Sequence, residues 1–320
     1  MKRFLVLLFV LSLESSIAQR GAANKKDPKA KQVAWETVTQ FQAKPLAEIS
    51  GLAASPIQPG VFWAHNDSGG EAALYAVNVK GDLLGSAAVA GVKNKDWEDL
   101  AAFQHQGKSY LLIGDVGDNG KKRPQVSLHV IPEPKALANG RYDGVQVHPE
   151  WTITLRYEDG PQDCESIAVD ASSKRVFLLN KDGKASVVYQ VPLLPATPSN
   201  TLIAKQVATL PQTANASSNV FGFVKAGLLG SRATGMDLST DGRTAVILTY
   251  TDIRLFNRGA KQSWEEAFLA KPVTTALPSI YQPEAICMSA DNDWVYVSSE
   301  ETPTPFVRCK LNEVRQLPQE

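Results

Sequence analysis

The sequence predicts an all-β protein whose fold class is a five-bladed β-propeller with a central channel. Five short segments share one pattern: an oxygen-bearing side chain, a mostly small residue, an apolar residue and a mostly small residue. Each copy is followed by a turn and a second apolar strand, and no amphipathic helix of three turns is evident in the chain. Such a repeat is typical of sheets arranged around one axis. The first residues of the five copies are Ser50, Glu98, Glu165, Thr234 and Glu284.

The spacing of the copies fits one blade each. Their first residues lie 48, 67, 69 and 50 residues apart. A four-stranded blade takes about 40 to 50 residues, so the two middle intervals leave room for longer loops. A sixth blade would have to lie in one of those intervals, and 215–232 is its best location. That stretch shows no strand alternation, so five blades are preferred.

Strand patterns place the elements within two blades. In blade one we expect strands at 35–39, 50–55, 61–65 and 73–77, and in blade three at 151–155, 165–170, 175–179 and 187–191. In both blades the first strand is expected to be the outermost of its own sheet, and the second the innermost. Short apolar alternations bounded by Gly, Asn, Asp and Pro favour these assignments.

The first 34 residues are expected to precede the propeller. Residues 1–18 begin with Lys2 and Arg3, continue with an apolar run and end in Ser16-Ile17-Ala18, the pattern of a signal peptide. The apolar run is short for a bilayer span, so an uncleaved anchor is the weaker alternative. Residues 19–34 are basic and polar and predict a flexible lead-in. The propeller domain is then expected at 35–315, in a secreted or periplasmic protein without a membrane segment.

Charge and cysteine content bear on the class of partner. Lys plus Arg and Asp plus Glu both number 33, which argues against binding to nucleic-acid polymers or anionic membranes. Cys164, Cys287 and Cys309 cannot all pair within one chain, and the last two are expected on strands that are not neighbours. We expect no structural disulfide and no Cys/His metal site. The protein is expected to be a monomer.

Small residues recur in the five segments because inner strands converge on the axis, where little room is left. Asp99 and Asp237 interrupt this pattern. A carboxylate at such a position has to be hydrogen-bonded or close to water, so both predict polar surroundings. The apolar residues expected to pack between blades are Leu52, Leu100, Ile167, Met236 and Ile286.

The first residues of the five segments are predicted to form one metal site. In antiparallel sheets the inner strands begin where the second strands end, so these side chains meet at one mouth of the channel. Three glutamates in one confined space either have raised pKa values or recruit a cation. Oxygen ligands suit Ca²⁺. The alternative is a water-filled tunnel lined by polar residues. The predicted calcium ligands are Ser50, Glu98, Glu165, Thr234 and Glu284.

This order of residues resembles the calcium-activated nucleotidases, an apyrase family with a five-bladed propeller and a central calcium. That family places Ser, Glu, Glu, Ser and Glu at the starts of its inner strands, and the five predicted ligands match these positions in order. Thr234 stands where the family has Ser and keeps the hydroxyl. The resemblance covers residues 35–312 through short motifs. It implies a Ca²⁺ cofactor and hydrolysis of nucleotides.

Loops at the same mouth carry the other candidates. A metal-dependent hydrolase needs a carboxylate to activate water and cations to neutralise developing charge. Asp residues in Gly-rich loops are more often turn formers, which is the structural alternative for each. The insert 215–232 is a candidate lid, or a segment that only packs on the propeller. The candidate catalytic residues are Asp67, Asp118, Asp163 and Asp182, and the candidate substrate-binding residues are Arg123, Lys181 and Arg232.

Together these features predict an exported, calcium-dependent hydrolase of an anionic small molecule. A phosphoester or phosphoanhydride is the leading substrate class, because a metal orients phosphate and activates water. Two alternatives remain open, since propellers serve many functions. One is a non-catalytic, calcium-stabilised module that binds a glycan or a protein. The other is a lactone or ester hydrolase.

Overall fold

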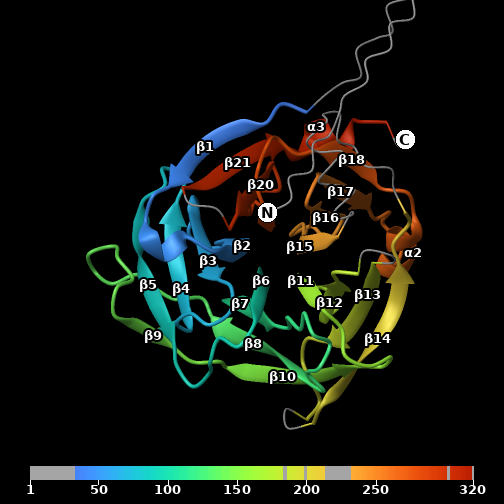
Figure 1. Ribbon diagram of the computed structural model, residues 1–320, viewed down its shortest axis with the longest axis horizontal. Helices are drawn as coiled ribbons and strands as arrows, with labels where there is room; N and C mark the ends of the chain where they lie inside the picture. The colour runs from blue at the N-terminus through green and yellow to red at the C-terminus, as the bar shows by residue number, and fades with distance from the viewer. Residues whose placement is uncertain (1–32, 183–185, 198–199, 213–231, 301–302, 319–320) are drawn as a thin grey trace, which may run out of the picture. The chain divides into compact units, whose positions relative to one another are not determined.

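The described residues consist of β-strands with a few short helical segments, so the all-β prediction is confirmed (Figure 1). The computed structural model describes residues 33–182, 186–197, 200–212, 232–300 and 303–318. The expected signal peptide, the lead-in up to residue 32 and the candidate lid up to residue 231 lie outside them. The helical segments are η1 (Lys44–Leu46), α2 (Trp264–Leu269) and α3 (Leu311–Arg315), and within the described chain none is long and apolar enough to cross a membrane.

The strands of the described residues form four hydrogen-bonded sheets. The first has the order β2-β3-β4-β5-β9, in which β9 is parallel to β5. Its other pairs are antiparallel and follow the chain order. Its strands are β2 (Ile49–Ala54), β3 (Val61–Asn66), β4 (Ala73–Asn78), β5 (Leu83–Val89) and β9 (Val145–Val147).

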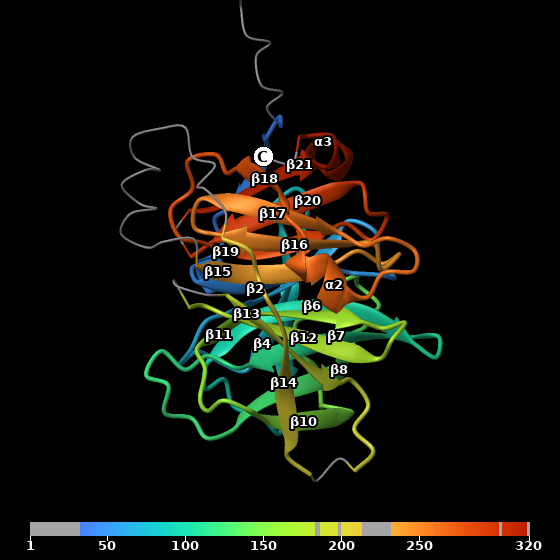
Figure 2. The same ribbon diagram turned by 90° about the vertical axis from the view of Figure 1, so that its right-hand side faces the viewer.

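The largest sheet has the order β11-β12-β13-β14-β10-β8-β7-β6. It consists of two antiparallel four-stranded sets whose outer strands, β10 and β14, pair in parallel. Figure 2 shows β14 extending from beside β13 to β10. The strands are β6 (Trp97–His105), β7 (Lys108–Asp115), β8 (Val126–Pro132), β10 (Trp151–Tyr157), β11 (Cys164–Asp170), β12 (Arg175–Asn180), β13 (Val187–Pro192) and β14 (Leu202–Thr209).

The remaining two sheets have four strands each. One has the order β15-β16-β17-β18 and the other the order β1-β21-β20-β19. Cys287 on β19 and Cys309 on β21 are separated by β20, and all three cysteines are free and buried. The strands are β15 (Ala233–Leu238), β16 (Thr244–Thr249), β17 (Asp252–Asn257), β18 (Val273–Ala276), β19 (Pro283–Met288), β20 (Trp294–Ser299), β21 (Thr304–Lys310) and β1 (Glu36–Phe41).

The structure corrects the sheet assignment of two outer strands. The segment at 35–39, expected in the sheet of β2, instead forms β1 and pairs with β21. The segment at 151–155, expected in the antiparallel set of β11, forms β10 and pairs antiparallel with β8. A strand that precedes an inner strand therefore belongs to the preceding set. Hydrophobic alternation shows that a strand exists, but it does not show which edge the strand pairs with.

The four sheets contain five antiparallel four-stranded sets: β2–β5, the two halves of the largest sheet, and the two four-stranded sheets. The innermost strands of these five sets follow one another around a common centre. Figure 1 shows β2, β6, β11 and β15 nearest that centre. Along the chain, β2 contacts β6, β6 contacts β11 and β11 contacts β15. β15 contacts β19, and β19 contacts β2, which closes the ring. Clusters of buried apolar residues lie between successive sets, and each contains one of the apolar residues of the repeat, as expected from the sequence. In chain order these residues are Leu52, Leu100, Ile167, Met236 and Ile286.

Local sequence explains the tight connection within one of these sets. Gln106 and Gly107 join β6 to β7, and both have positive φ angles, 49° and 74°. Two such residues form the two-residue turn whose twist matches that of the flanking strands. Gly is the residue that adopts this conformation most readily. The pairing of His105 with Lys108 therefore starts directly at the turn.

Asp99 and Asp237 bind backbone N–H groups of neighbouring inner strands. Asp99 Oδ2 accepts hydrogen bonds from Ile167 N at 2.8 Å and Met236 N at 3.1 Å. Asp237 Oδ2 accepts from Met288 N at 2.7 Å. An innermost strand has no partner strand on its axial side, so its axial N–H groups need other acceptors. The two carboxyls thus link β6 to β11 and β15, and β15 to β19, and the expected polar surroundings are confirmed.

Asp237 is expected to make the protein less stable as the pH rises through neutrality. Burial raises the pKa of Asp237 to about 7, against about 3.9 for an unfolded Asp. Between these values the folded state holds a proton that the unfolded state has lost, so stability increases as the pH falls from about 7 to about 4.

The measurement is urea unfolding of the wild type and of Asp237→Asn at about pH 5 and about pH 8. The wild type should lose more stability than the variant between the two conditions, by up to about 1.4 kcal/mol per pH unit. Equal losses in the two proteins would contradict the prediction.

Candidate metal centre

Each inner strand carries a β-bulge near its beginning, and the extra residue is one of the predicted metal ligands. In the pairing of β2 with β3, the register steps from Ile49 to Gly51 while the partner strand advances by one residue, which leaves Ser50 extra. A bulge re-aims a side chain relative to the regular pleat. The five residues therefore occupy equivalent positions. The same shift leaves Glu98, Glu165, Thr234 and Glu284 extra in β6, β11, β15 and β19.

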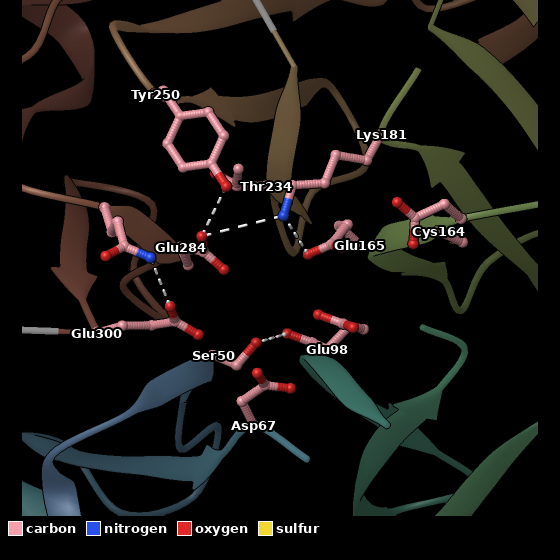
Figure 3. A network of polar contacts seen from close by, with 12 residues as sticks. Ser50, Asp67, Glu98, Cys164, Glu165, Lys181, Thr234, Tyr250, Glu284 and Glu300 are labelled. Atoms are coloured by element: carbon pink, nitrogen blue, oxygen red, sulfur yellow. Dashed lines mark hydrogen bonds and ion pairs between the residues drawn. The ribbon is translucent and has the colours of Figure 1, made fainter. Parts of the chain in front are cut away.

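The five side chains surround one central space (Figure 3). Ser50 Oγ donates a hydrogen bond to the backbone oxygen of Glu98 at 2.7 Å. Thr234 Oγ1 donates to the backbone oxygen of Pro283 at 2.8 Å. Each hydroxyl hydrogen thus goes to the next inner strand, and the oxygen lone pairs stay available to a cation. The hydroxyls link strands and can bind a metal at the same time.

Further carboxylates extend this site on the side of β2 and β6. Oxygens of Asp67, Asp96 and Glu98 lie within 4.8 Å of one another. Burial, followed by the charge of Glu165, raises the pKa of Glu98 well above its usual value. Burial and the charge of Asp67 raise the pKa of Asp96 to about 6. These groups hold protons more tightly than carboxyls in water, as expected where negative charge is crowded.

A second crowded region lies on the side of β19. Burial, followed by the charge of Glu284, raises the pKa of Glu300 to about 8. Glu300 Oε2 accepts a hydrogen bond from Gln282 Nε2 at 3.1 Å. Tyr250 donates its hydroxyl to Glu284 Oε1 at 2.8 Å. The centre is therefore acidic on both sides.

Lys181 is the cation at this centre (Figure 3). Its Nζ lies 3.1 Å from Glu165 Oε2 and 4.0 Å from Glu284 Oε1. Burial opposes its charge, but Glu165 and Glu284 outweigh burial and raise the pKa of Lys181. Among the described residues, no other Lys or Arg lies within ion-pair distance of the six acidic side chains. The acidic side chains gathered at this centre are Asp67, Asp96, Glu98, Glu165, Glu284 and Glu300.

This donor set fits a hard divalent cation. All its donors are oxygens, from carboxylates and hydroxyls, which Ca²⁺ prefers. Crowded, buried carboxylates are costly unless a cation balances them. The crowded carboxyls of this centre therefore favour a bound cation. The residues present are therefore compatible with the calcium that the family resemblance implies.

The candidate catalytic aspartates lie at different distances from the centre. Asp67 belongs to the acidic group of Glu98, and Asp163 is close enough for its charge to raise the pKa of Glu165. Asp118 is buried in the loop after β7, where its Oδ2 accepts from Arg123 N at 2.6 Å. Asp182 pairs with Lys121 at 3.7 Å, and both side chains are exposed. The structure brings Asp67 and Asp163 to the acidic centre and places Asp118 and Asp182 in loop contacts.

The candidate substrate-binding residues are also separated. Lys181 is at the centre. The guanidinium of Arg123 contacts Asp115 Oδ1 at 2.6 Å and the backbone oxygen of Gly117 at 2.7 Å, so it braces its own loop. Arg232 is exposed just before β15. Of the three, Lys181 alone contacts the predicted metal ligands among the described residues.

Sequence reasoning did not select Asp96, Tyr250 or Glu300. Asp96 lies two residues before Glu98, and residues two apart in an extended chain share a side. This spacing could have indicated that Asp96 lies beside Glu98. Tyr250 and Glu300 follow the second strands β16 and β20, and their loops were expected at this mouth, but their side chains gave no pattern of their own. Their contacts with Glu284 and Gln282 depend on the fold.

Gly117 fits closely against the acidic group. A Cβ atom at this position would lie 2.0 Å from Glu98 Oε1 and 2.6 Å from Asp96 Cγ. Gly117→Ala is therefore expected to push these carboxylates apart and to weaken calcium binding by about tenfold or more, a loss typical of disturbed metal-site geometry. Calorimetric titration of metal-stripped protein with Ca²⁺ measures it.

Gly120→Ala in the same loop is the matched control. There the three atoms nearest to an added Cβ would all belong to the side chain of Lys122, at 3.4 Å or more. This variant should bind Ca²⁺ like the wild type. Equal affinity of all three proteins would show that the contact of Gly117 with Glu98 is unimportant.

No family model and no curated protein matches the chain. Among solved structures, it is similar to Raptor of Chaetomium thermophilum, with a TM-score of 0.39, 10% identity, and coverage of 84% of this chain and 20% of that one. It is also similar to a candidate 6-phosphogluconolactonase of Bacteroides uniformis, with a TM-score of 0.34, 13% identity, and coverage of 78% and 64%. The chain thus spans less than two thirds of either, and at these TM-scores neither similarity bears on function.

Proposed function

We propose that the five four-stranded sets are the blades of a five-bladed β-propeller, and that its acidic mouth binds Ca²⁺ to hydrolyse a phosphoester or phosphoanhydride. The observation that carries the proposal is the equivalent bulge in all five inner strands. It presents an oxygen-bearing side chain to the same space each time. The same local distortion in all five inner strands supports a common task for the side chains that it aims.

The residues that would hold the ion are the five bulge residues, with Asp96 beside Glu98. When bound, Ca²⁺ would supply charge that orients a phosphate group and favours attack by water. Ser50 and Thr234 match the two hydroxyl positions of the resembled family, with Thr in place of Ser at the second. The carboxylates Glu98, Glu165 and Glu284 would supply most of the charge that attracts the ion.

The chain's own groups then have distinct tasks. Asp67 is partly exposed, and one of its oxygens accepts from Ser68 N at 2.5 Å, which leaves the other to accept a proton from an attacking water. Lys181 would stabilise negative charge on the phosphoryl oxygens. Tyr250, hydrogen-bonded to Glu284, would hold that carboxylate in position.

The test is an activity panel on metal-stripped protein. Phosphoesters, phosphoanhydrides and lactones are each supplied with and without Ca²⁺, and released phosphate or acid is measured. Phosphate release that requires Ca²⁺ is the expected result. Stabilisation by Ca²⁺ without any turnover would instead select the non-catalytic binding module, and hydrolysis of lactones alone would select the lactone hydrolase.

Export is part of the same proposal. It depends on the signal-peptide pattern of residues 1–18, which lie outside the described residues. A secreted or periplasmic location would expose the site to calcium concentrations that suit weak extracellular sites, about 10⁻⁴ to 10⁻³ M. The substrate would then be a small anion, and the protein is proposed to act as a monomer.

A further inference from the structure

A cavity of about 480 Å³ lies beside the acidic centre, between the loop before β6 and strands β7 and β8. The centre is lined by carboxyls, whereas this cavity includes two lysines, which are positively charged. Burial lowers the pKa of its histidine, His129, and so favours the neutral imidazole. The lining residues are Gly91, Val92, Lys93, Lys95, Asp115, Ser127 and His129. The structure thus places a cationic cavity next to an anionic site.

The loop before β6 divides the two sites. Lys93 and Lys95 line the cavity, whereas the alternate residues Asn94 and Asp96 face the loop of Asp67. Asn94 Nδ2 donates to the backbone oxygen of Asp67 at 2.8 Å. Asn94 Oδ1 accepts from Trp97 N at 3.2 Å. One anchored segment therefore presents lysines to one side and a carboxylate to the other.

Two of the lining side chains are buried. His129 is buried, and its Nδ1 lies 3.1 Å from Thr152 Oγ1, which leaves Nε2 for a ligand. Asp115 is buried and its carboxylate is paired with Arg123 at 2.6 Å. This ion pair balances the negative charge of Asp115. The two lysines then leave the cavity with an excess of positive charge.

We propose that this cavity binds a phosphate-sized oxyanion, independently of any metal, and that it holds a second anionic group of the substrate. The second half of this statement rests on the proposed function. Ammonium groups and an imidazole N–H are donors suited to oxyanions. The reacting group would bind at the acidic centre, and the second group would bind across the Asp115–Arg123 pair. The ligand class is therefore a small molecule with two separated anionic groups.

The experiment is calorimetric titration of metal-stripped protein, kept in EDTA at low ionic strength, with inorganic phosphate as the probe. The variant is Lys93→Gln/Lys95→Gln. The matched control is Lys108→Gln, at the opposite end of β7, where the lysine pairs with Glu150 and its side chain is 67% exposed. Both changes concern exposed lysines, so thermal melting should show the three proteins equally folded.

We expect the wild type and the control to bind phosphate, and the double variant to bind it about tenfold more weakly, the loss typical of two exposed charge contacts. No binding by the wild type, or equal affinity in the double variant, would overturn the proposal.

Failure of the phosphate-binding proposal can be distinguished from failure of the proposed hydrolase. Lysine-dependent phosphate binding without any hydrolysis would leave the cavity standing while the hydrolase fails. Calcium-dependent hydrolysis, with no phosphate binding in the presence of EDTA, would support the hydrolase and overturn the phosphate site in the cavity.

Discussion

Replacing Glu165 with Gln is expected to abolish calcium-dependent phosphate release and to weaken Ca²⁺ binding by on the order of 100-fold or more. Loss of a residue that only supports a ligand costs about 10- to 100-fold in metal affinity, and Glu165 is proposed to be a ligand itself. Gln keeps the shape and one oxygen but loses the charge. Phosphate release from the best substrate of the panel, and calorimetric titration with Ca²⁺, measure the two effects.

Without Ca²⁺, the Glu165→Gln substitution is not expected to harm the protein. Burial raises the pKa of Glu165, and the charges of Glu284 and Asp163 act in the same direction, although Lys181 opposes them. Removing one of several crowded charges should therefore leave thermal stability unchanged or higher without Ca²⁺, while stabilisation by Ca²⁺ disappears. Glu150→Gln, at a partly exposed carboxylate, is the control. Retained calcium stabilisation in Glu165→Gln would show that Glu165 is not a ligand.

Asp99→Ala is expected to lower the free energy of unfolding by about 3 kcal/mol. Each buried N–H left without an acceptor costs about 1–3 kcal/mol, and two such groups, on Ile167 and Met236, depend on Asp99 Oδ2. Part of that cost is offset, because burial raises the pKa of Asp99 and makes its ionised form unfavourable. Urea unfolding at neutral pH measures the difference.

Two further variants define the cause. Asp99→Asn keeps an oxygen that can accept from both N–H groups, so its loss should be smaller. Asp143→Ala removes an exposed aspartate whose side chain is 58% accessible and paired with Arg141, and it should change stability by less than about 0.5 kcal/mol. If Asp99→Ala were as stable as Asp143→Ala, the linkage of inner strands through Asp99 would carry no energy.

The repeat was sufficient to locate the innermost strands and the residues at their starts. Small and apolar residues alternate there because each inner strand packs between two neighbouring sets, and Leu52 and Ile167 lie in different apolar clusters as a result. Outer strands were harder to assign. β1 is far from β21 in the chain, and pairing across that distance depends on how the sets close on one another.

The candidate site was predictable to the same extent. Glu98 and Glu165 follow from the repeat. Asp96 and Tyr250 were missed, because the residue type at their positions differs from copy to copy: Asp163 matches Asp96, whereas Lys181 and Glu300 match Tyr250. Arg123 shows the opposite case. Its charge suggested that it binds an anionic substrate, but in the fold its guanidinium hydrogen-bonds to the Asp115 carboxylate and to backbone oxygens of its own loop.

The sequence by itself determined that the protein is built from strands, where the inner strands begin and which oxygen-bearing side chains stand at those points, because side-chain alternation and turn residues are local properties. Tertiary structure alone decided which outer strands pair, that a bulge aims each candidate ligand, that Asp99 and Asp237 bind neighbouring strands, and that a cationic cavity adjoins the acidic centre. Those features arise from contacts between residues far apart in the chain, and no local pattern encodes which distant group will be the partner.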